Sequence, residues 1–235
     1  MECLILIPIT AQSLHCSESM RPSGLLGLLV LLLLPFLSVA QQPFVEGYIR
    51  YKIHIETPEG KSFKGTYTFT FKDGYIKKEL KLNSGYADVI VINSNNSTVY
   101  SLKNIAGKKY AIQLSMDEMQ NRQMKYSGFK LETNDKDHKK LDGVDVVKGM
   151  VTFPDGSTSV IYFSPKWYPD KSITFEKYPN AHFMPLIFDL KDENGVSTYM
   201  EAEKISVNPV ESAEFRVPSD YTIITNQEYK NLNKY

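Results

Sequence analysis

Apolar and polar residues alternate along several stretches of the chain, and this alternation restricts the possible fold more than any other feature. In residues 63–71, Lys and Thr occupy every even position, whereas four odd positions are aromatic: Phe63, Tyr67, Phe69 and Phe71. Residues 45–55 repeat the pattern with Val, Ile and Tyr. Since successive side chains of a strand point to opposite faces, a period of two indicates half-buried strands. The sequence therefore predicts antiparallel strands with one apolar and one polar face.

Short turn motifs separate these stretches. They are Pro58-Glu59-Gly60, Asp73-Gly74, Asn93 to Asn96, Asp155-Gly156 and Asn194-Gly195. Asp-Gly and Asn-Gly adopt the positive φ values that tight hairpins need. A meander of about ten strands must curl or close to limit its exposed edges. We therefore predict a mainly β fold, a single strongly curved antiparallel sheet or open half-barrel with one packed α-helix.

Residues 115–126 carry the pattern of that helix. Ser115 and Glu118 have the spacing of a capping box. Met116, Met119 and Gln123 share one face of the helix, and Met124 lies beside it. Clustered Met side chains often line surfaces that accept variable apolar ligands. Met116, Met119 and Met124 are therefore candidate ligand-binding residues, and the alternative is that this face packs on the sheet as core.

The N-terminal region predicts export. Arg21 precedes an apolar run over residues 25–37, and Ser38-Val39-Ala40 offers small residues for cleavage. This apolar segment is short for a membrane span, which needs about 20 residues. We expect translation to start at Met20, residues 20–40 to form a signal peptide, and cleavage to follow Ala40. The expected product is a periplasmic or exported protein without a stable membrane span, with one β-rich domain over residues 41–225 and a polar tail over residues 226–235.

Composition narrows the class of protein. Both cysteines, Cys3 and Cys16, precede the predicted cleavage site, so the mature chain is expected to lack disulfides. An exported domain without cysteine fits a bacterial envelope better than an animal extracellular space. The chain holds 27 basic and 27 acidic residues. It therefore lacks the excess of positive charge that is typical of nucleic-acid-binding proteins. We therefore expect no nucleic-acid partner.

Recognisable catalytic motifs are missing from the sequence. The histidines of the predicted mature chain, His54, His138 and His182, have no metal-ligand spacing. The chain also lacks a G-x-S-x-G elbow and a Gly-rich phosphate loop. We therefore predict no catalytic residue, no metal site and no cofactor, and we do not expect an enzyme.

A long segment over residues 162–183 combines seven aromatic residues with three prolines. Connections of this length without clear secondary structure are uncommon and often functional. Two interpretations remain open: a loop that covers one end of the curved sheet, or an aromatic rim that binds a lipid or a glycan. The candidate ligand-binding residues in this segment are Trp167, Tyr168, Phe175 and Phe183.

Three motifs in the second half of the chain carry a family resemblance. They are the run from Met184 to Leu190 followed by Gly195, the run from Tyr199 to Ala202, and the closing run from Phe215 to Tyr221. With the predicted signal peptide and meander, they resemble exported domains of unknown function that are common in Bacteroidetes. Those domains are similar to the periplasmic lipoprotein-carrier (LolA/LolB-like) superfamily, and the resemblance covers most of residues 44–225.

The resemblance implies a curved sheet whose concave side is covered by helices and, in the carriers, holds acyl chains. This chain departs from the carriers in having one predicted helix where they use several. The leading functional hypothesis is a non-enzymatic periplasmic binding or carrier protein whose apolar concave face holds a lipid, an acyl chain or a lipidated protein. The alternative is an envelope interaction or structural protein with a solid core, which docks a protein or glycan through its surface or aromatic loop.

Overall fold

The computed structural model describes residues 41–235 except 174, 176 and 233–235. The described residues all belong to one compact unit. The predicted start at Met20, the signal peptide over residues 20–40 and the cleavage site after Ala40 lie outside the described residues, so they remain predictions.

Strands dominate the described residues. They are β1 (Gln42–Phe44), β2 (Glu46–Glu56), β3 (Ser62–Lys72), β4 (Tyr75–Leu82), β5 (Ala87–Asn93), β6 (Thr98–Ile105), β7 (Lys108–Leu114), β8 (Lys130–Leu141), β9 (Val144–Thr152), β10 (Thr158–Ser164), β11 (Trp167–Pro169), β12 (Met184–Lys191), β13 (Ser197–Ser206) and β14 (Thr222–Thr225). The helices are α2 (Met116–Met124), the 3-10 helix η1 (Ser212–Phe215) and α3 (Asn226–Leu232).

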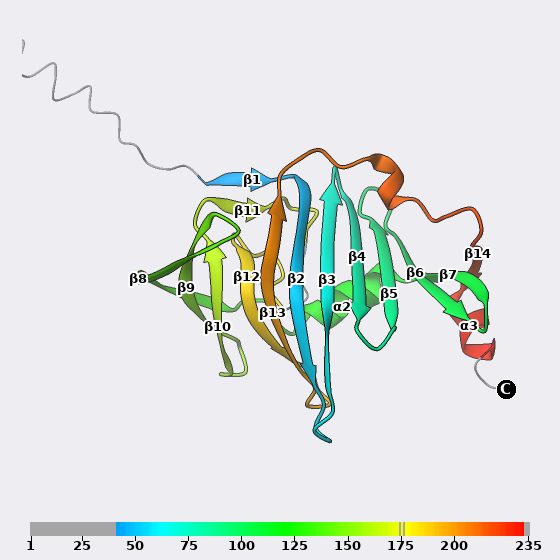
Figure 1. The fold of residues 1–235 in the computed structure, drawn as a ribbon, viewed down its shortest axis with the longest axis horizontal. Coiled ribbons are helices and arrows are strands. Elements are labelled where there is room, and N and C mark those ends of the chain that lie inside the picture. Colours follow the sequence, from blue (N-terminus) through cyan, green and yellow to red (C-terminus); the bar gives the residue numbers. More distant parts are fainter. Residues whose placement is uncertain (1–40, 174, 176, 233–235) are drawn as a thin grey trace, which may run out of the picture. The chain divides into compact units, whose positions relative to one another are not determined.

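One large sheet holds 12 of these strands, in the order β14-β7-β6-β5-β4-β3-β2-β13-β12-β10-β9-β8 (Figure 1). Neighbouring strands are antiparallel, except that β14 runs parallel to β7. The sheet has two edges, β8 and β14, so it is not closed into a barrel. β1 and β11 form a separate parallel pair. The predicted mainly β class with a curved, open sheet is therefore confirmed.

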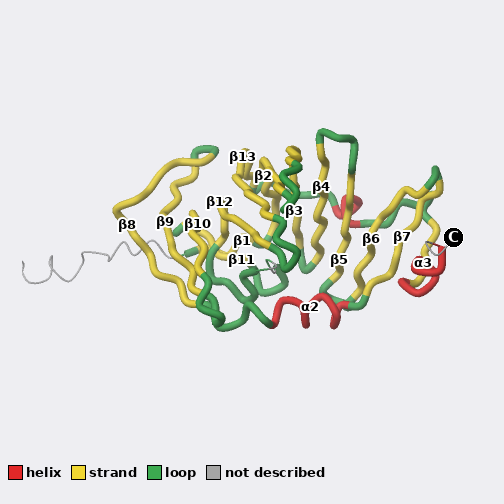
Figure 2. Tube along the Cα trace, turned by 90° about the horizontal axis from the view of Figure 1, so that it is seen from below, coloured by secondary structure: helices red, strands yellow, loops and turns green. Residues whose placement is uncertain are grey.

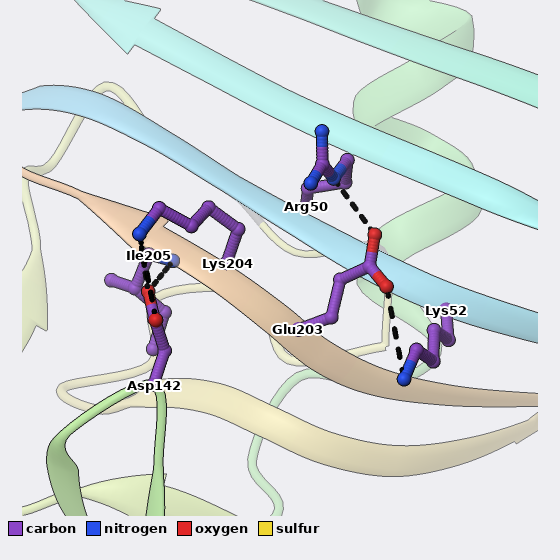
Figure 3. Close-up of polar contacts among 6 residues, drawn as sticks. All are labelled: Arg50, Lys52, Asp142, Glu203, Lys204 and Ile205. Carbon is purple, nitrogen blue, oxygen red and sulfur yellow. Dashed lines mark hydrogen bonds and ion pairs between the residues drawn. The ribbon is translucent and has the colours of Figure 1, made fainter.

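A contact made by the β8–β9 turn shows that the sheet is strongly curved at this end. Asp142 in this turn accepts a hydrogen bond from the backbone N–H of Ile205 at 2.8 Å. The same carboxylate pairs with Lys204 Nζ at 3.4 Å (Figure 3). Ile205 and Lys204 belong to β13, and β12 and β10 lie between β13 and β9 in the sheet. The turn therefore reaches back across the sheet to β13.

The two faces of the central strands differ as the alternation predicts. Ile49, Tyr51 and Ile53 of β2 are buried on what we call the inner face. The intervening side chains of β2 lie on the outer face, where Arg50 pairs with Glu203 of β13 at 2.8 Å (Figure 3). An apolar inner face must be covered, since its exposure to water would cost about 25 cal/mol per Å².

Helix α2 and residues 170–183, which we call the aromatic segment, cover the inner face (Figure 2). The α2 N-terminus forms as predicted, because Ser115 Oγ accepts a hydrogen bond from the Glu118 N–H at 3.2 Å. In the aromatic segment, the Phe175 ring lies 5.1 Å from that of Phe69 on β3. The Tyr178 ring lies 5.9 Å from that of Phe188 on β12. The aromatic segment is thus part of the hydrophobic core.

The outer face has its own small apolar cluster: Val91, Leu102, Ala111 and Phe215. Phe215 comes from η1, in the segment 207–221 that connects β13 to β14 (Figure 1). Ion pairs join this segment to the sheet. Lys77 of β4 pairs with Glu214 at 2.9 Å, and Lys109 of β7 pairs with Asp220 at 2.6 Å.

The C-terminal residues form a helix that the sequence analysis did not anticipate. Residues 226–232, predicted as part of a polar tail, form α3, in which no residue is buried. A reciprocal cap explains it: Glu228 N–H donates to Thr225 Oγ1 at 3.2 Å, and Thr225 N–H donates to Glu228 Oε2 at 2.7 Å. This is a capping box at the start of a mostly polar helix.

Among the described residues, none of the helices combines the length and the apolar character that crossing a bilayer requires.

Candidate functional site

The described residues do not fill the inner face completely, and two of the pockets between them adjoin each other. The first, which we call the apolar pocket, has a volume of about 210 Å³. It lies between the inner sides of β2, β3, β4, β12 and β13 and the aromatic segment. Large apolar side chains form most of its wall, among them Tyr51, Tyr67, Phe69, Phe175, Phe188 and Met200.

The second pocket, which we call the helix pocket, has a volume of about 510 Å³ and lies between α2 and the sheet. Its apolar floor comes from strands β5, β6 and β7: Ile90, Ile92, Val99 and Leu114. Its other side is more polar. Helix α2 contributes Met119, Arg122 and Gln123, and the turn between β12 and β13 contributes residues 192–194.

Lys78 stands where the two pockets adjoin, because its side chain lines both. It occupies a position of β4 that pairs with Phe69 of β3 and Ile90 of β5, so it shares their inner face. Only 5% of Lys78 is exposed, and its Nζ lies 5.5 Å from the centre of the Phe69 ring. Lys78 therefore places a buried ionisable side chain beside an aromatic ring where the two pockets meet.

An ion pair joins the two elements at the rim of the helix pocket. Lys125, just after α2, pairs with Glu193 in the β12–β13 turn. This hydrogen bond is the main reason that the pKa of Lys125 is raised. Lys125 and Lys177 both approach the Tyr126 ring, at 5.0 and 5.6 Å. Burial, followed by repulsion from Lys125, lowers the pKa of Lys177.

Gln123 is the polar residue of α2 that points inward. It is 7% exposed, and among the described residues its Nε2 has no hydrogen-bond partner. A buried donor without an acceptor costs about 1–3 kcal/mol. Gln123 lines the helix pocket, so a ligand oxygen in that pocket would be a suitable acceptor.

The structure places the methionine candidates differently from one another. Met119 lines the helix pocket, and Met116 is half-buried against the core. Met124 is 66% exposed and lies away from both. The reason is the helical period, since Met116, Met119 and Gln123 share the face that meets the sheet, and Met124 falls beside it.

The aromatic candidates also lie in different parts of the structure. Phe175 lines the apolar pocket, whereas Phe183 is 3% exposed and packs 5.4 Å from Phe163 in the core. Trp167 stacks on Phe44 at 5.2 Å. Trp167 and Tyr168 are half-buried on β11 and line neither pocket. Of the sequence candidates, only Met119 and Phe175 therefore border the two pockets.

The sequence analysis missed Lys78. The sequence contains a pattern that could have identified it. Ile76, Lys78 and Leu80 alternate with Lys77 and Glu79, so Lys78 occupies a position on the apolar face of its strand. Within the described part of the chain, no group of three or more His, Cys, Asp and Glu side chains is arranged to hold a metal ion.

Comparison with known proteins gives distant structural similarity. No protein-family model and no curated protein matches the chain. An uncharacterized conserved protein from Thermus thermophilus is similar with a TM-score of 0.44 and 12% identity, over 78% of this chain and 93% of that chain. A LolA-superfamily protein from Nitrosomonas europaea is similar with a TM-score of 0.37 and 11% identity, over 75% and 92%.

The Pseudomonas aeruginosa MucA/MucB complex is also similar, with a TM-score of 0.41 and 12% identity over 77% of this chain. The match spans 59% of that chain, which is less than two thirds of its length. A LolA-superfamily protein is thus among the similar structures. Because the three TM-scores are below 0.5, the argument for function depends on the pockets themselves.

Proposed function

We propose that this chain is a non-enzymatic binding or carrier protein of the bacterial envelope that holds an acyl chain on the inner face of its curved sheet. The observation that carries the proposal is the apolar pocket, an unfilled space of about 210 Å³ walled by aromatic and aliphatic side chains. The adjoining helix pocket, at about 510 Å³, falls within the range of roughly 300–1,000 Å³ typical of small-molecule sites.

Burial of the ligand's acyl chain supplies the binding energy in this proposal. Each methylene group moved from water into an apolar site contributes about 0.8 kcal/mol. The cost of association and of ordering the ligand offsets part of that sum. Non-directional contacts of this kind suit a carrier, because the acyl chain can enter and leave the pocket without a chemical step.

The lining of the pockets supports binding rather than catalysis. Among the described residues, no histidine lines either pocket, and the Ser115 hydroxyl at the helix pocket caps α2. Acyl transfer needs a nucleophile within hydrogen-bond reach of a base. The alternative is docking of a protein or glycan through the surface or the aromatic loop. Phe175 and Phe183 are buried and cannot contribute to it, so it would depend on Trp167 and Tyr168, which are half-buried.

Displacement of an apolar fluorescent dye from the purified protein tests the proposal, together with native mass spectrometry for co-purified lipid. Thr198 on β13 lines the apolar pocket and is half-buried. We expect Thr198→Trp to fill the pocket and weaken dye binding. Ser197→Trp is the matched control, because Ser197 is the exposed neighbour on the opposite face. The proposal fails if the unaltered protein binds neither dye nor dodecanol, or if the two variants bind the dye equally well.

A further inference from the structure

One polar group on the inward side of α2 has no hydrogen-bond partner among the described residues, and it indicates what the helix pocket can hold. Gln123 is 7% exposed and lines that pocket, and its Nε2 is the atom without an acceptor. Gln123 lies four residues after Met119 on α2, so the helix directs both side chains toward the sheet. The terminal torsion of a glutamine is broad, so the amide can turn Nε2 toward an acceptor in the pocket.

The charged side chains of the helix pocket do not select a charged ligand. Lys125 and Glu193 pair with each other at its rim. Lys78 already takes part in interactions within the protein, so it is not counted as a site for a ligand charge. Arg122 and Asp192 remain, one charge of each sign. An ion that left water for this pocket would therefore lose its hydration without meeting a net opposite charge. The pocket favours an uncharged acceptor.

The functional group that suits this donor accepts hydrogen bonds and donates none. The apolar floor of the pocket is formed by Ile90, Ile92, Val99 and Leu114. These side chains contain no acceptor, so a donor on the ligand would meet none there. An alcohol and a secondary amide each bring a donor of their own, and a carboxylate brings a charge. An ester carbonyl brings neither, and the hydrocarbon chain attached to it can lie on the same floor.

We propose that the helix pocket binds an uncharged acyl ester, whose carbonyl oxygen accepts a hydrogen bond from Gln123 Nε2 while its hydrocarbon chain lies on the apolar floor. This inference rests on the proposed function and deepens it, because it names the class of ligand. Burial of the hydrocarbon chain supplies most of the affinity. The hydrogen bond supplies selectivity, since a ligand without an acceptor leaves a buried donor unsatisfied.

Two probes of similar length test the hydrogen bond: methyl decanoate, which has the carbonyl, and 1-chlorodecane, which lacks it. Each is added to the purified protein below its solubility limit, and its affinity is measured by displacement of an apolar fluorescent dye. Gln123→Met removes the donor and keeps an unbranched side chain. We expect it to weaken binding of the ester by about fivefold to tenfold and to leave binding of 1-chlorodecane unchanged.

Gln120→Met is the matched control for this substitution, because Gln120 is exposed on the same helix and does not line the pocket. We expect it to leave both affinities unchanged. Equal effects of Gln123→Met on the two probes overturn the inference, since the carbonyl would then make no contact that depends on the amide.

Infrared spectroscopy observes the carbonyl itself. Because a hydrogen bond weakens the C=O bond, the stretching band of carbonyl-labelled methyl decanoate should lie at lower wavenumber in the unaltered protein than in an alkane solvent. Gln123→Met should return the band toward its position in alkane, and Gln120→Met should not. A band at the alkane position in the unaltered protein overturns the inference, even where Gln123→Met fails to fold. A lowered band that Gln123→Met leaves in place overturns it too.

Decanoate tests whether the ligand is uncharged. Water solvates this anion more strongly than its methyl ester, so tighter binding of decanoate would mean that the pocket recognises negative charge. We expect the ester to bind more tightly, and the reverse order overturns the inference. If the protein binds both methyl decanoate and 1-chlorodecane but the tests of the hydrogen bond fail, acyl-chain binding stands. If it binds neither, the proposed function fails as well.

Discussion

Tyr178 packs the aromatic segment against the sheet, as Phe175 does, and its replacement tests whether that segment is core. The ring is 1% exposed. It contacts Phe129 and Phe153 at 6.1 Å, Phe183 at 5.7 Å and Phe188 at 5.9 Å. These partners come from different parts of the chain, so one side chain joins the aromatic segment to several elements.

The expected cost follows from this packing. A buried aromatic ring removes about 150–250 Å² from water, worth about 4–6 kcal/mol at 25 cal/mol per Å². Tyr178→Ala should therefore lower the free energy of unfolding by about 3–5 kcal/mol, the range measured for buried aromatic residues. The hydroxyl contributes little, because its contact with Ser159 is long, at 3.4 Å. Tyr178→Phe should accordingly cost less than about 1 kcal/mol.

Urea unfolding, followed by the fluorescence of the single tryptophan, measures both variants. Tyr86→Ala is the matched control, since Tyr86 is 50% exposed and its loss should cost less than about 0.5 kcal/mol. Burial raises the pKa of Tyr178 to about 12, so the comparison is free of tyrosine ionisation at neutral pH. A cost below about 1 kcal/mol for Tyr178→Ala would refute the assignment of the aromatic segment to the core.

Three further changes test other parts of the fold. Asp142→Asn should lower the urea midpoint near neutral pH. The hydrogen bond from the Ile205 N–H, more than Lys204, holds the pKa of Asp142 below its usual 3.8. The ionised carboxylate therefore stabilises the fold fully above pH 3.8, and the difference between the unaltered protein and the variant should disappear as the pH falls through the lower, folded-state pKa. Phe215→Ala should cost about 3 kcal/mol and increase binding of a hydrophobic dye, because Phe215 is 6% exposed over the outer-face cluster. Ser115→Ala should cost about 1 kcal/mol in unfolding free energy through loss of the α2 cap, and Ser115→Asp should restore most of it.

Local chemistry explains why much of the sheet was predictable. The alternation in β2 and β3 follows directly from the period of a strand, and the turn residues Asp73 and Gly74 have the expected positive φ values of 48° and 83°. Ala106 and Gly107 form a similar turn with φ values of 50° and 80°. That turn gives a weaker sequence signal, because alanine rarely adopts a positive φ and the surrounding hairpin must impose it.

Contacts between distant residues explain what the sequence left open. β14 joins β7 in parallel, with Ile224 opposite Ile112, and no local pattern encodes such a partner. The placement of Phe175 inside and Trp167 on β11 likewise depends on elements far away in the sequence. Gln123 was visible on the inward face of its helix, but its lack of an acceptor emerges only once the sheet lies against that face.

The aromatic segment determines how much of the concave face can hold a ligand. The curvature of the sheet follows from its many strands, yet curvature alone leaves open whether the interior is filled. Tyr178 and Phe183 fill part of it, and Phe175 ends at the edge of a space of only about 210 Å³. A space of that size suits one chain better than several, and the buried cation of Lys78 stands between it and the helix pocket. The same packing that stabilises the fold thus limits the space on the inner face that is open to a ligand.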